Sequence, residues 1–238
     1  VADPKFVRSY IVLADYMSAR YDYVGAIETL KSAMYVNRNH HGIYRGFALI
    51  ELRRRNYDGA IRFAEKALQL YDTDIETILI MAQAYYFAGD PETAFKYVHQ
   101  AIELDPSSEE AHGTYARVLV ALQGTQAGID YLEDIISRFD KIEYIRTLGD
   151  ILAEEERNKD AVQTYYKALS INPKDKPTLM ALGKVLQKEK DYTQARDNLL
   201  EAAAIDPSDE ETLFLTGQLY MESNKPAFAL KPFERVID

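Results

Sequence analysis

The sequence predicts an all-α protein built as a solenoid of stacked helical hairpins, and three observations support this fold class. The Asx-Pro pairs at Asn172 and Asp206 lie 34 residues apart, and a third pair at Asp105 lies 67 residues before Asn172, one residue short of two such periods. Small residues recur at fixed places within the period. Each period also holds two segments whose apolar residues recur about every 3.6 residues, which is typical of amphipathic helices. A fixed period of this length indicates stacked units of supersecondary structure.

At this period the chain divides into repeats over residues 7–40, 41–74, 75–108, 109–141, 142–175, 176–209 and 210–238, of which the fourth is one residue short and the last is incomplete. Alanine or glycine occupies two places in every repeat. The eighth place holds Ala14, Ala48, Ala82, Ala116, Gly149, Gly183 and Gly217, and the twentieth holds Ala26, Ala60, Ala94, Gly128, Ala161, Ala195 and Ala229. Small side chains let two crossing helices approach closely, so each repeat is predicted to be a hairpin of two helices.

Helix starts are predicted where the apolar pattern breaks. Asp90 is expected to cap a helix whose first residue is Pro91, because aspartate is favoured at the N-cap and proline at the first helical position. Asp58 is expected to cap the helix that follows the arginine run. Two capping boxes, in which a serine caps the helix and a glutamate three residues later reaches back, are predicted at Ser107 with Glu110 and at Ser208 with Glu211.

The later repeats contain a characteristic set of residues, namely Leu148-Gly149, Leu182-Gly183, Gly217 with Tyr220, and Ala161, Tyr165, Ala168 and Pro173. This layout resembles the tetratricopeptide repeat (TPR) over essentially the whole chain. The resemblance implies a right-handed superhelix of about seven helix-turn-helix hairpins, in which the first helix of each hairpin lines a concave groove. It specifies the fold closely and says little about function.

The fourth repeat departs most from the pattern. Gly124 lies in the turn between its helices, Gly128 replaces an alanine, and Ile135 replaces the next small residue. Glycine inside a helix costs roughly 0.5–1 kcal/mol relative to alanine. One interpretation is a drifted repeat in which Ile135 fills the volume lost at Gly128. The alternative is a kink that separates residues 1–139 from the rest.

Both ends of the chain are interpreted as cut ends of a longer array. Pro4 lies three periods before Pro106, so residues 1–6 are expected to be the tail of a preceding repeat. The alternative is that Asp3 simply caps the first helix. The last repeat stops inside its second helix. A fragment of this kind can associate end to end through its uncovered hairpins.

The composition excludes several classes of function. The 238 residues carry a formal net charge of −10 and no cysteine. This acidic balance argues against nucleic-acid binding, which needs a basic surface. No apolar stretch approaches the roughly 20 residues that a membrane-spanning helix needs, so membrane insertion is not predicted. The absence of cysteine excludes disulfides and suits a soluble protein of the cytoplasm or the periplasm equally.

No catalytic chemistry is predicted. The phosphate-binding glycine loop, the dinucleotide-binding glycine motif and the zinc-protease motif are all missing from the sequence. His40 and His41 meet at a repeat boundary and are expected to be exposed loop residues, because a metal site would need further ligands. The sequence therefore predicts no enzyme activity, no metal and no cofactor.

The predicted binding surface is the outward stripe of the first helices in the second, third and fourth repeats. Its candidate residues share one helical face and are Arg45, Leu49, Leu52, Arg53, Leu79, Gln83, Tyr86, Arg117 and Val120. Such a stripe suits an extended or helical peptide with apolar and acidic groups, since arginine can bind a carboxylate through two nitrogens. The alternative is that these arginines pair with neighbouring acids and bind nothing. Arg54 and Arg55 are assigned to the helix end, where positive charge favours the helix dipole.

The predicted function is a non-catalytic protein–protein interaction module, a scaffold or assembly adaptor that holds a partner segment in its groove. On this hypothesis Arg45→Glu combined with Arg53→Glu weakens partner binding without unfolding the array. Two alternatives stay open. One is a regulatory or sensory domain attached to an enzyme outside these residues. The other is a structural element of a larger assembly, such as a secretion, pilus or polysaccharide-export machine.

Overall fold

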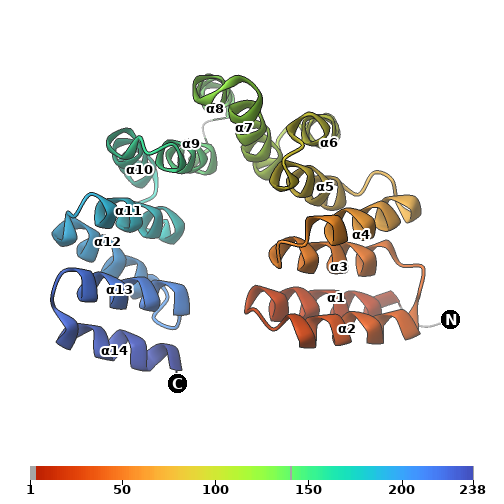
Figure 1. Cartoon of the computed structure of the whole chain (residues 1–238), viewed down its shortest axis with the longest axis horizontal. Helices are drawn as coiled ribbons and strands as arrows, with labels where there is room; N and C mark the ends of the chain where they lie inside the picture. The colour runs from red at the N-terminus through yellow and green to blue at the C-terminus, as the bar shows by residue number, and fades with distance from the viewer. Residues whose placement is uncertain (1–3, 140, 238) are drawn as a thin grey trace. The chain divides into compact units, whose positions relative to one another are not determined.

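The computed structural model describes residues 4–139 and 141–237, which form helices joined by short turns (Figure 1). The chain divides into two compact units, residues 1–128 and 129–238. The helices are α1 (Pro4–Ala19), α2 (Tyr23–Val36), α3 (His41–Arg53), α4 (Tyr57–Leu70), α5 (Ile75–Ala88), α6 (Pro91–Leu104), α7 (Glu109–Gln123), α8 (Thr125–Phe139), α9 (Ile142–Glu154), α10 (Asn158–Ile171), α11 (Lys176–Lys188), α12 (Tyr192–Ile205), α13 (Glu210–Glu222) and α14 (Pro226–Ile237). The division between the units falls within α8.

Each unit is a stack of helical hairpins, which confirms the predicted all-α solenoid. In the first unit α1 packs on α2, α3 on α4 and α5 on α6, and the second helix of each pair also packs on the first helix of the next. The first helices α1, α3, α5 and α7 contact one another in order along the stack. In the second unit α9, α11 and α13 have the same relation, each with its own partner helix.

The small residues lie where the helices of a hairpin cross. All seven residues of the eighth place and all seven of the twentieth place are buried. Gly149 packs so closely on Tyr165 that an added Cβ atom would lie 2.5 Å from Cε1 of the ring. At Gly217 the same atom would lie 2.3 Å from Cε1 of Phe233. In these two hairpins a glycine therefore packs against an aromatic ring sixteen residues later in the chain.

The observed helix starts confirm the predicted cap at Asp90 and correct the two predicted capping boxes. Asp90 caps α6 by accepting a hydrogen bond from the Thr93 N–H, and Pro91 is the first helical residue, as predicted. The capping boxes at Ser107 and Ser208 are wrong, because α7 and α13 begin one residue later than predicted.

The physical reason is a tight turn before each of these helices. The Asp105 carboxylate accepts hydrogen bonds from the Ser107 N–H and hydroxyl, so that serine is already engaged, and Ser108 becomes the cap of α7. Asp206 and Ser208 repeat this arrangement, and Asp209 caps α13.

Two further predictions concern helix ends. Asn56 caps α4, so Asp58 lies in the first turn of that helix and is not its cap. Arg54 follows the last residue of α3 and Arg55 has a positive φ of 60°, so both lie at the helix end as predicted. The proposed cap role of Asp3 lies outside the described residues.

Candidate binding groove

The first unit contains a groove across its first helices. A cavity of about 350 Å³ opens there, in the size range of ligand sites in proteins. Four helices contribute its walls, and its lining residues are Ile11, Val12, Asp15 and Ser18 from α1, Arg45, Gly46, Leu49 and Arg53 from α3, Glu76 and Ile80 from α5, and Glu110 from α7. Of the residues predicted from the sequence, Arg45, Leu49 and Arg53 are therefore brought together.

Arg53 is held at one end of the groove. Its Nη1 donates to the Asp15 carboxylate at 2.8 Å, to the Asp15 carbonyl oxygen at 3.2 Å and to the Ser18 hydroxyl. All of its hydrogen bonds to the described residues run through Nη1, so Nη2 donates none to them. Because the Arg53 and Asp15 side chains are 31% and 55% exposed, water screens their ion pair, and such a pair stabilises the fold only weakly.

Arg45 lies at the other end of the groove and has a structural contact. Its Nη1 lies 3.0 Å from the Asp74 carboxylate and 2.8 Å from that of Glu76. Asp74 is buried, immediately precedes α5 and also accepts a hydrogen bond from the Thr77 hydroxyl. Arg45 therefore joins α3 to the start of the next hairpin.

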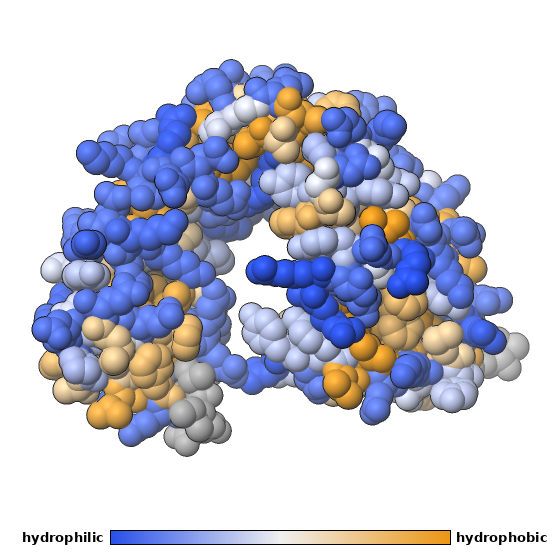
Figure 2. Space-filling view, in the orientation of Figure 1, coloured by the Kyte–Doolittle hydropathy of each residue, from blue (hydrophilic) through white to orange (hydrophobic). Residues whose placement is uncertain are grey.

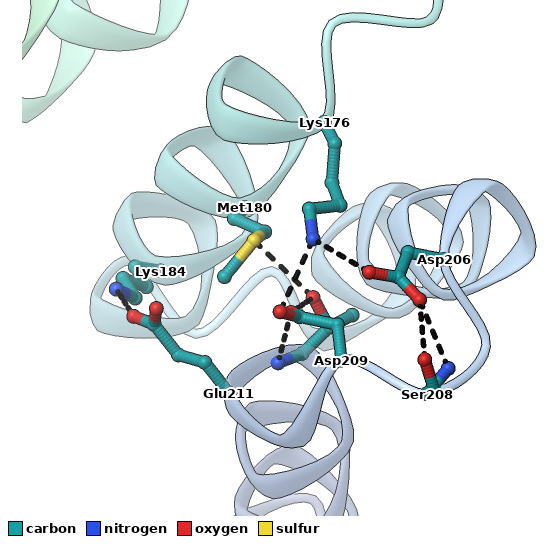
Figure 3. Close-up of polar contacts among 8 residues, drawn as sticks. Lys176, Met180, Lys184, Asp206, Ser208, Asp209 and Glu211 are labelled. Atoms are coloured by element: carbon teal, nitrogen blue, oxygen red, sulfur yellow. Dashed lines mark hydrogen bonds and ion pairs between the residues drawn. The ribbon is translucent and has the colours of Figure 1, made fainter. Parts of the chain in front are cut away.

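The same contact recurs in the second unit. Arg146 of α9 donates to the Asp175 carboxylate at 2.9 Å, and Asp175 caps α11 through the Thr178 N–H. One pair further along, Met180 occupies the arginine place, and Lys176 instead lies 3.1 Å from Asp209, the cap of α13 (Figure 3). Because this link recurs between different hairpins, we assign Arg45 primarily to stacking of the repeats. The combined substitution Arg45→Glu and Arg53→Glu, which is predicted to leave the array folded, would break this link.

The remaining predicted residues do not line the cavity. Leu79 is only 3% exposed and packs in a core cluster with Ile78 and Val98, so it offers no surface to a partner. Leu52 packs against another core cluster. The others are distributed along α5 and α7: Gln83 donates to the Glu110 carboxylate at 2.9 Å, Tyr86 lies edge-on to Phe87, Val120 lies against Gly128, and Arg117 is half-buried.

The groove residues absent from the prediction come mainly from α1. The stripe was applied only from the second repeat onward, although the fifth, ninth and twelfth places of the first repeat are Ile11, Asp15 and Ser18. Extending the stripe by one repeat would have found them. Ile80 is a different case, since it stands next to the predicted Leu79 and the helix turns it, not Leu79, toward the cavity.

The charge of the groove differs from the predicted basic stripe. Its lining holds two cations, Arg45 and Arg53, and three carboxylates, Asp15, Glu76 and Glu110. The alternative stated from the sequence, in which the arginines pair with neighbouring acids, therefore describes Arg45 and Arg53. An apolar floor of Ile11, Val12, Leu49 and Ile80 lies among these charges.

A histidine caps the first turn of α3. His40 caps α3, with its Nδ1 accepting a hydrogen bond from the Gly42 N–H at 3.2 Å, while its ring stacks on His41. It is therefore not the exposed loop residue predicted. Burial lowers the pKa of His40 below its ordinary value of 6.5, and the charges of His41 and Arg45 lower it further.

We expect stability to depend on the titration of His40. The folded protein favours the neutral ring, so stability is complete above pH 6.5 and falls as the pH drops through 6.5 toward the lower folded pKa. In urea titrations on either side of pH 6.5, His40→Asn should reduce this loss, because asparagine caps helices without titrating. His99→Asn is the control, since His99 is half-exposed on α6. An unchanged pH dependence in His40→Asn would refute this role.

No group of three or more His, Asp or Glu side chains within residues 4–139 and 141–237 is arranged to hold a metal ion. No helix in the same part of the chain is both long and apolar enough to cross a membrane.

Exposed apolar side chains gather over α13 and α14, seen as orange at the lower left of Figure 2, and include Phe214, Met221, Phe228 and Leu230.

Comparison with known proteins finds helical-repeat relatives. The family model described as "Anaphase-promoting complex, cyclosome, subunit 3" matches residues 53–135, and the model described as "Tetratricopeptide repeat" matches residues 152–211. The protein CTR9 homolog of Arabidopsis thaliana is 26% identical over 171 residues, which are 68% of this chain and 15% of that protein. The human protein O-mannosyl-transferase TMTC1 is 27% identical over 134 residues, 56% of this chain and 14% of that protein.

Among solved structures, yeast Tom70 aligns with a TM-score of 0.82 at 19% identity, covering 97% of this chain and 49% of that chain. At this identity the likeness concerns the fold alone. The chain spans only about 15% of the length of the CTR9 homolog and 14% of TMTC1.

The stacked hairpins and their buried small residues define a helical-repeat solenoid. Together with this fold, the two family models that match residues 53–135 and 152–211 support a tetratricopeptide-repeat protein. Proteins of this family are in general protein-interaction scaffolds, and the fold is typically a non-catalytic interaction module.

Proposed function

We propose that this chain is a non-catalytic interaction module that holds a segment of a partner protein in the groove of the first unit. The observation that supports this most directly is the cavity across α1, α3, α5 and α7. Its floor is aliphatic and its walls carry the ion pairs of Arg45 and Arg53. An apolar floor favours burial of a partner's apolar side chain, and the polar walls orient it.

A peptide segment suits this groove better than a compact small molecule. The cavity extends over the first helices of four successive hairpins, so its length follows the stack. Its polar groups lie at separate places along that length, with Arg53 and Asp15 in one group and Arg45, Glu76 and Glu110 in another. Solenoids commonly use such extended inner surfaces to bind partner proteins.

Partner binding should be lost when the groove floor is made polar. Leu49→Asp places a charge on the aliphatic floor, and we expect it to weaken binding of a partner at least about tenfold, equivalent to roughly 1.4 kcal/mol. Partners would be recovered with the 238-residue chain as bait, and affinity of each purified partner would then be measured by calorimetry.

Leu70→Asp is the matched control. Leu70 is the last residue of α4, is exposed, and does not line the groove. Circular dichroism melting of both variants separates lost binding from lost folding. Equal affinity of wild type, Leu49→Asp and Leu70→Asp for every recovered partner would show that the groove is not the binding site.

A further inference from the structure

The two ends of the groove differ in charge. At the start of α5 and α7, Asp74, Glu76 and Glu110 outnumber the single cation Arg45. At the far end of α3, Arg53 faces Asp15, and the chain continues directly into Arg54 and Arg55. Arg54 pairs with Glu51 at 3.0 Å, whereas no contact of Arg55 is found among the described residues. One end of the groove is therefore acidic. At the other, which we call the basic end, Arg53 and Asp15 balance each other within the lining, and Arg54 and Arg55 follow at the end of the helix.

The acidic end has carboxylate oxygens available to a ligand. Glu76 is 69% exposed, and its Oε2 lies 2.8 Å from Nη1 of Arg45. Glu110 is exposed and accepts from Gln83 through Oε1 alone. Within the described part of the chain, the second oxygen of each carboxylate accepts no hydrogen bond. Two such oxygens lining one cavity can accept hydrogen bonds from an ammonium or guanidinium group.

The basic end has hydrogen-bond donors available to a ligand. Arg53 uses only Nη1 for Asp15 and Ser18, so its Nη2 and Nε remain for a second acceptor. A ligand carboxylate can share the guanidinium with Asp15 or displace it, because that pair is exposed and weak. The aliphatic floor formed by Ile11, Leu49 and Ile80 lies on the same groove surface.

From this arrangement we propose that the partner segment is dipolar, with a basic residue at the Glu76–Glu110 end, an apolar residue on the floor and an acidic residue at Arg53. This rests on the proposed function and specifies the partner chemistry of the same groove. It departs from the predicted partner, which had acidic and apolar groups but no basic one.

The two charged ends lie on different helices, with Glu76 on α5, Glu110 on α7 and Arg53 on α3. The recognised pattern is therefore a basic residue and an acidic residue on either side of an apolar one, in one chain direction or the other.

The test is selection of peptides from a random displayed library on the immobilised 238-residue chain. Enrichment of peptides in which an apolar residue lies between a basic and an acidic residue is the expected result. With Glu76→Lys combined with Glu110→Lys, the preference for the basic residue should disappear while the apolar preference stays. With Arg53→Glu, the preference for the acidic residue should disappear instead.

Matched controls lie on neighbouring second helices. Glu92→Lys changes a first-turn glutamate of α6, and Arg62→Glu changes an exposed arginine of α4; neither lines the groove. Both should keep the wild-type preference. Enrichment of acidic and apolar residues alone would overturn the dipolar partner and leave the proposed function standing. Enrichment of no peptide would overturn both, and a preference that survives all groove variants would place binding elsewhere.

Discussion

Replacing Tyr165 by alanine should lower the free energy of unfolding by about 3–5 kcal/mol, the usual cost of removing a buried aromatic ring. Tyr165 is 1% exposed, packs closely against Gly149, and donates its hydroxyl hydrogen to the Asp150 carboxylate at 2.8 Å. Its removal leaves a cavity at the crossing of α9 and α10. The measurement is urea unfolding followed by circular dichroism, with hydrogen exchange to locate the loss, since repeat arrays can unfold in parts.

Tyr166 provides the matched control, because it is the next residue of α10 and is 41% exposed. Tyr166→Ala should cost less than about 1 kcal/mol, as surface substitutions usually do. Gly149→Ala tests the same contact from the glycine. The added Cβ would collide with the Tyr165 ring, so this substitution should lower the free energy of unfolding by about 1–3 kcal/mol. Combining it with Tyr165→Leu should recover part of that loss. Equal stability of the Tyr165→Ala and Tyr166→Ala proteins would contradict this packing.

Removing the Asp175 carboxylate should destabilise the second unit by about 2–3 kcal/mol. The residue has two roles at once. It caps α11 by accepting hydrogen bonds from the Thr178 N–H and hydroxyl, and it pairs with Arg146 of the preceding hairpin. The Asp175 and Arg146 side chains are only 14% and 23% exposed, so Asp175→Ala leaves a largely buried cation without this partner.

The control for this prediction is a cap without the ion pair. Asp191 caps α12 through the Gln194 N–H, and no arginine or lysine pairs with it among the described residues. Asp191→Ala should therefore cost about 1 kcal/mol, the usual value for an N-cap. Asp175→Asn should fall between the two, because asparagine can still cap the helix. If Asp175→Ala and Asp191→Ala lose equal stability, the link between hairpins contributes nothing measurable.

The fold was predictable because its signals are local and repeated. Small residues at the helix crossings, such as Ala161, and caps such as Asp90 recur at fixed distances in the chain. The misplaced caps at Ser107 and Ser208 show the limit of such signals. An aspartate two residues earlier competes for each serine, and a pattern match does not reveal which hydrogen bond forms.

The candidate groove was predictable in part. Leu49 and Arg53 of the predicted stripe line the cavity, because both lie on one face of a single helix. It placed Leu79 there as well, although that side chain packs in the core. Leu79 and Ile80 are adjacent on α5. Which of them faces the cavity depends on the rotation of α5 about its axis, and packing between hairpins sets that rotation.

The sequence by itself determined the all-α solenoid and the crossing points of its helices, because a side chain's size acts on the helix next to it and recurs with each repeat. Only the tertiary structure decided what the arginines meet. Arg45 pairs with Asp74 across 29 residues of chain and Arg53 with Asp15 across 38. Such pairs depend on how one hairpin stacks on the next, so the charge of the groove emerges only when the hairpins are stacked.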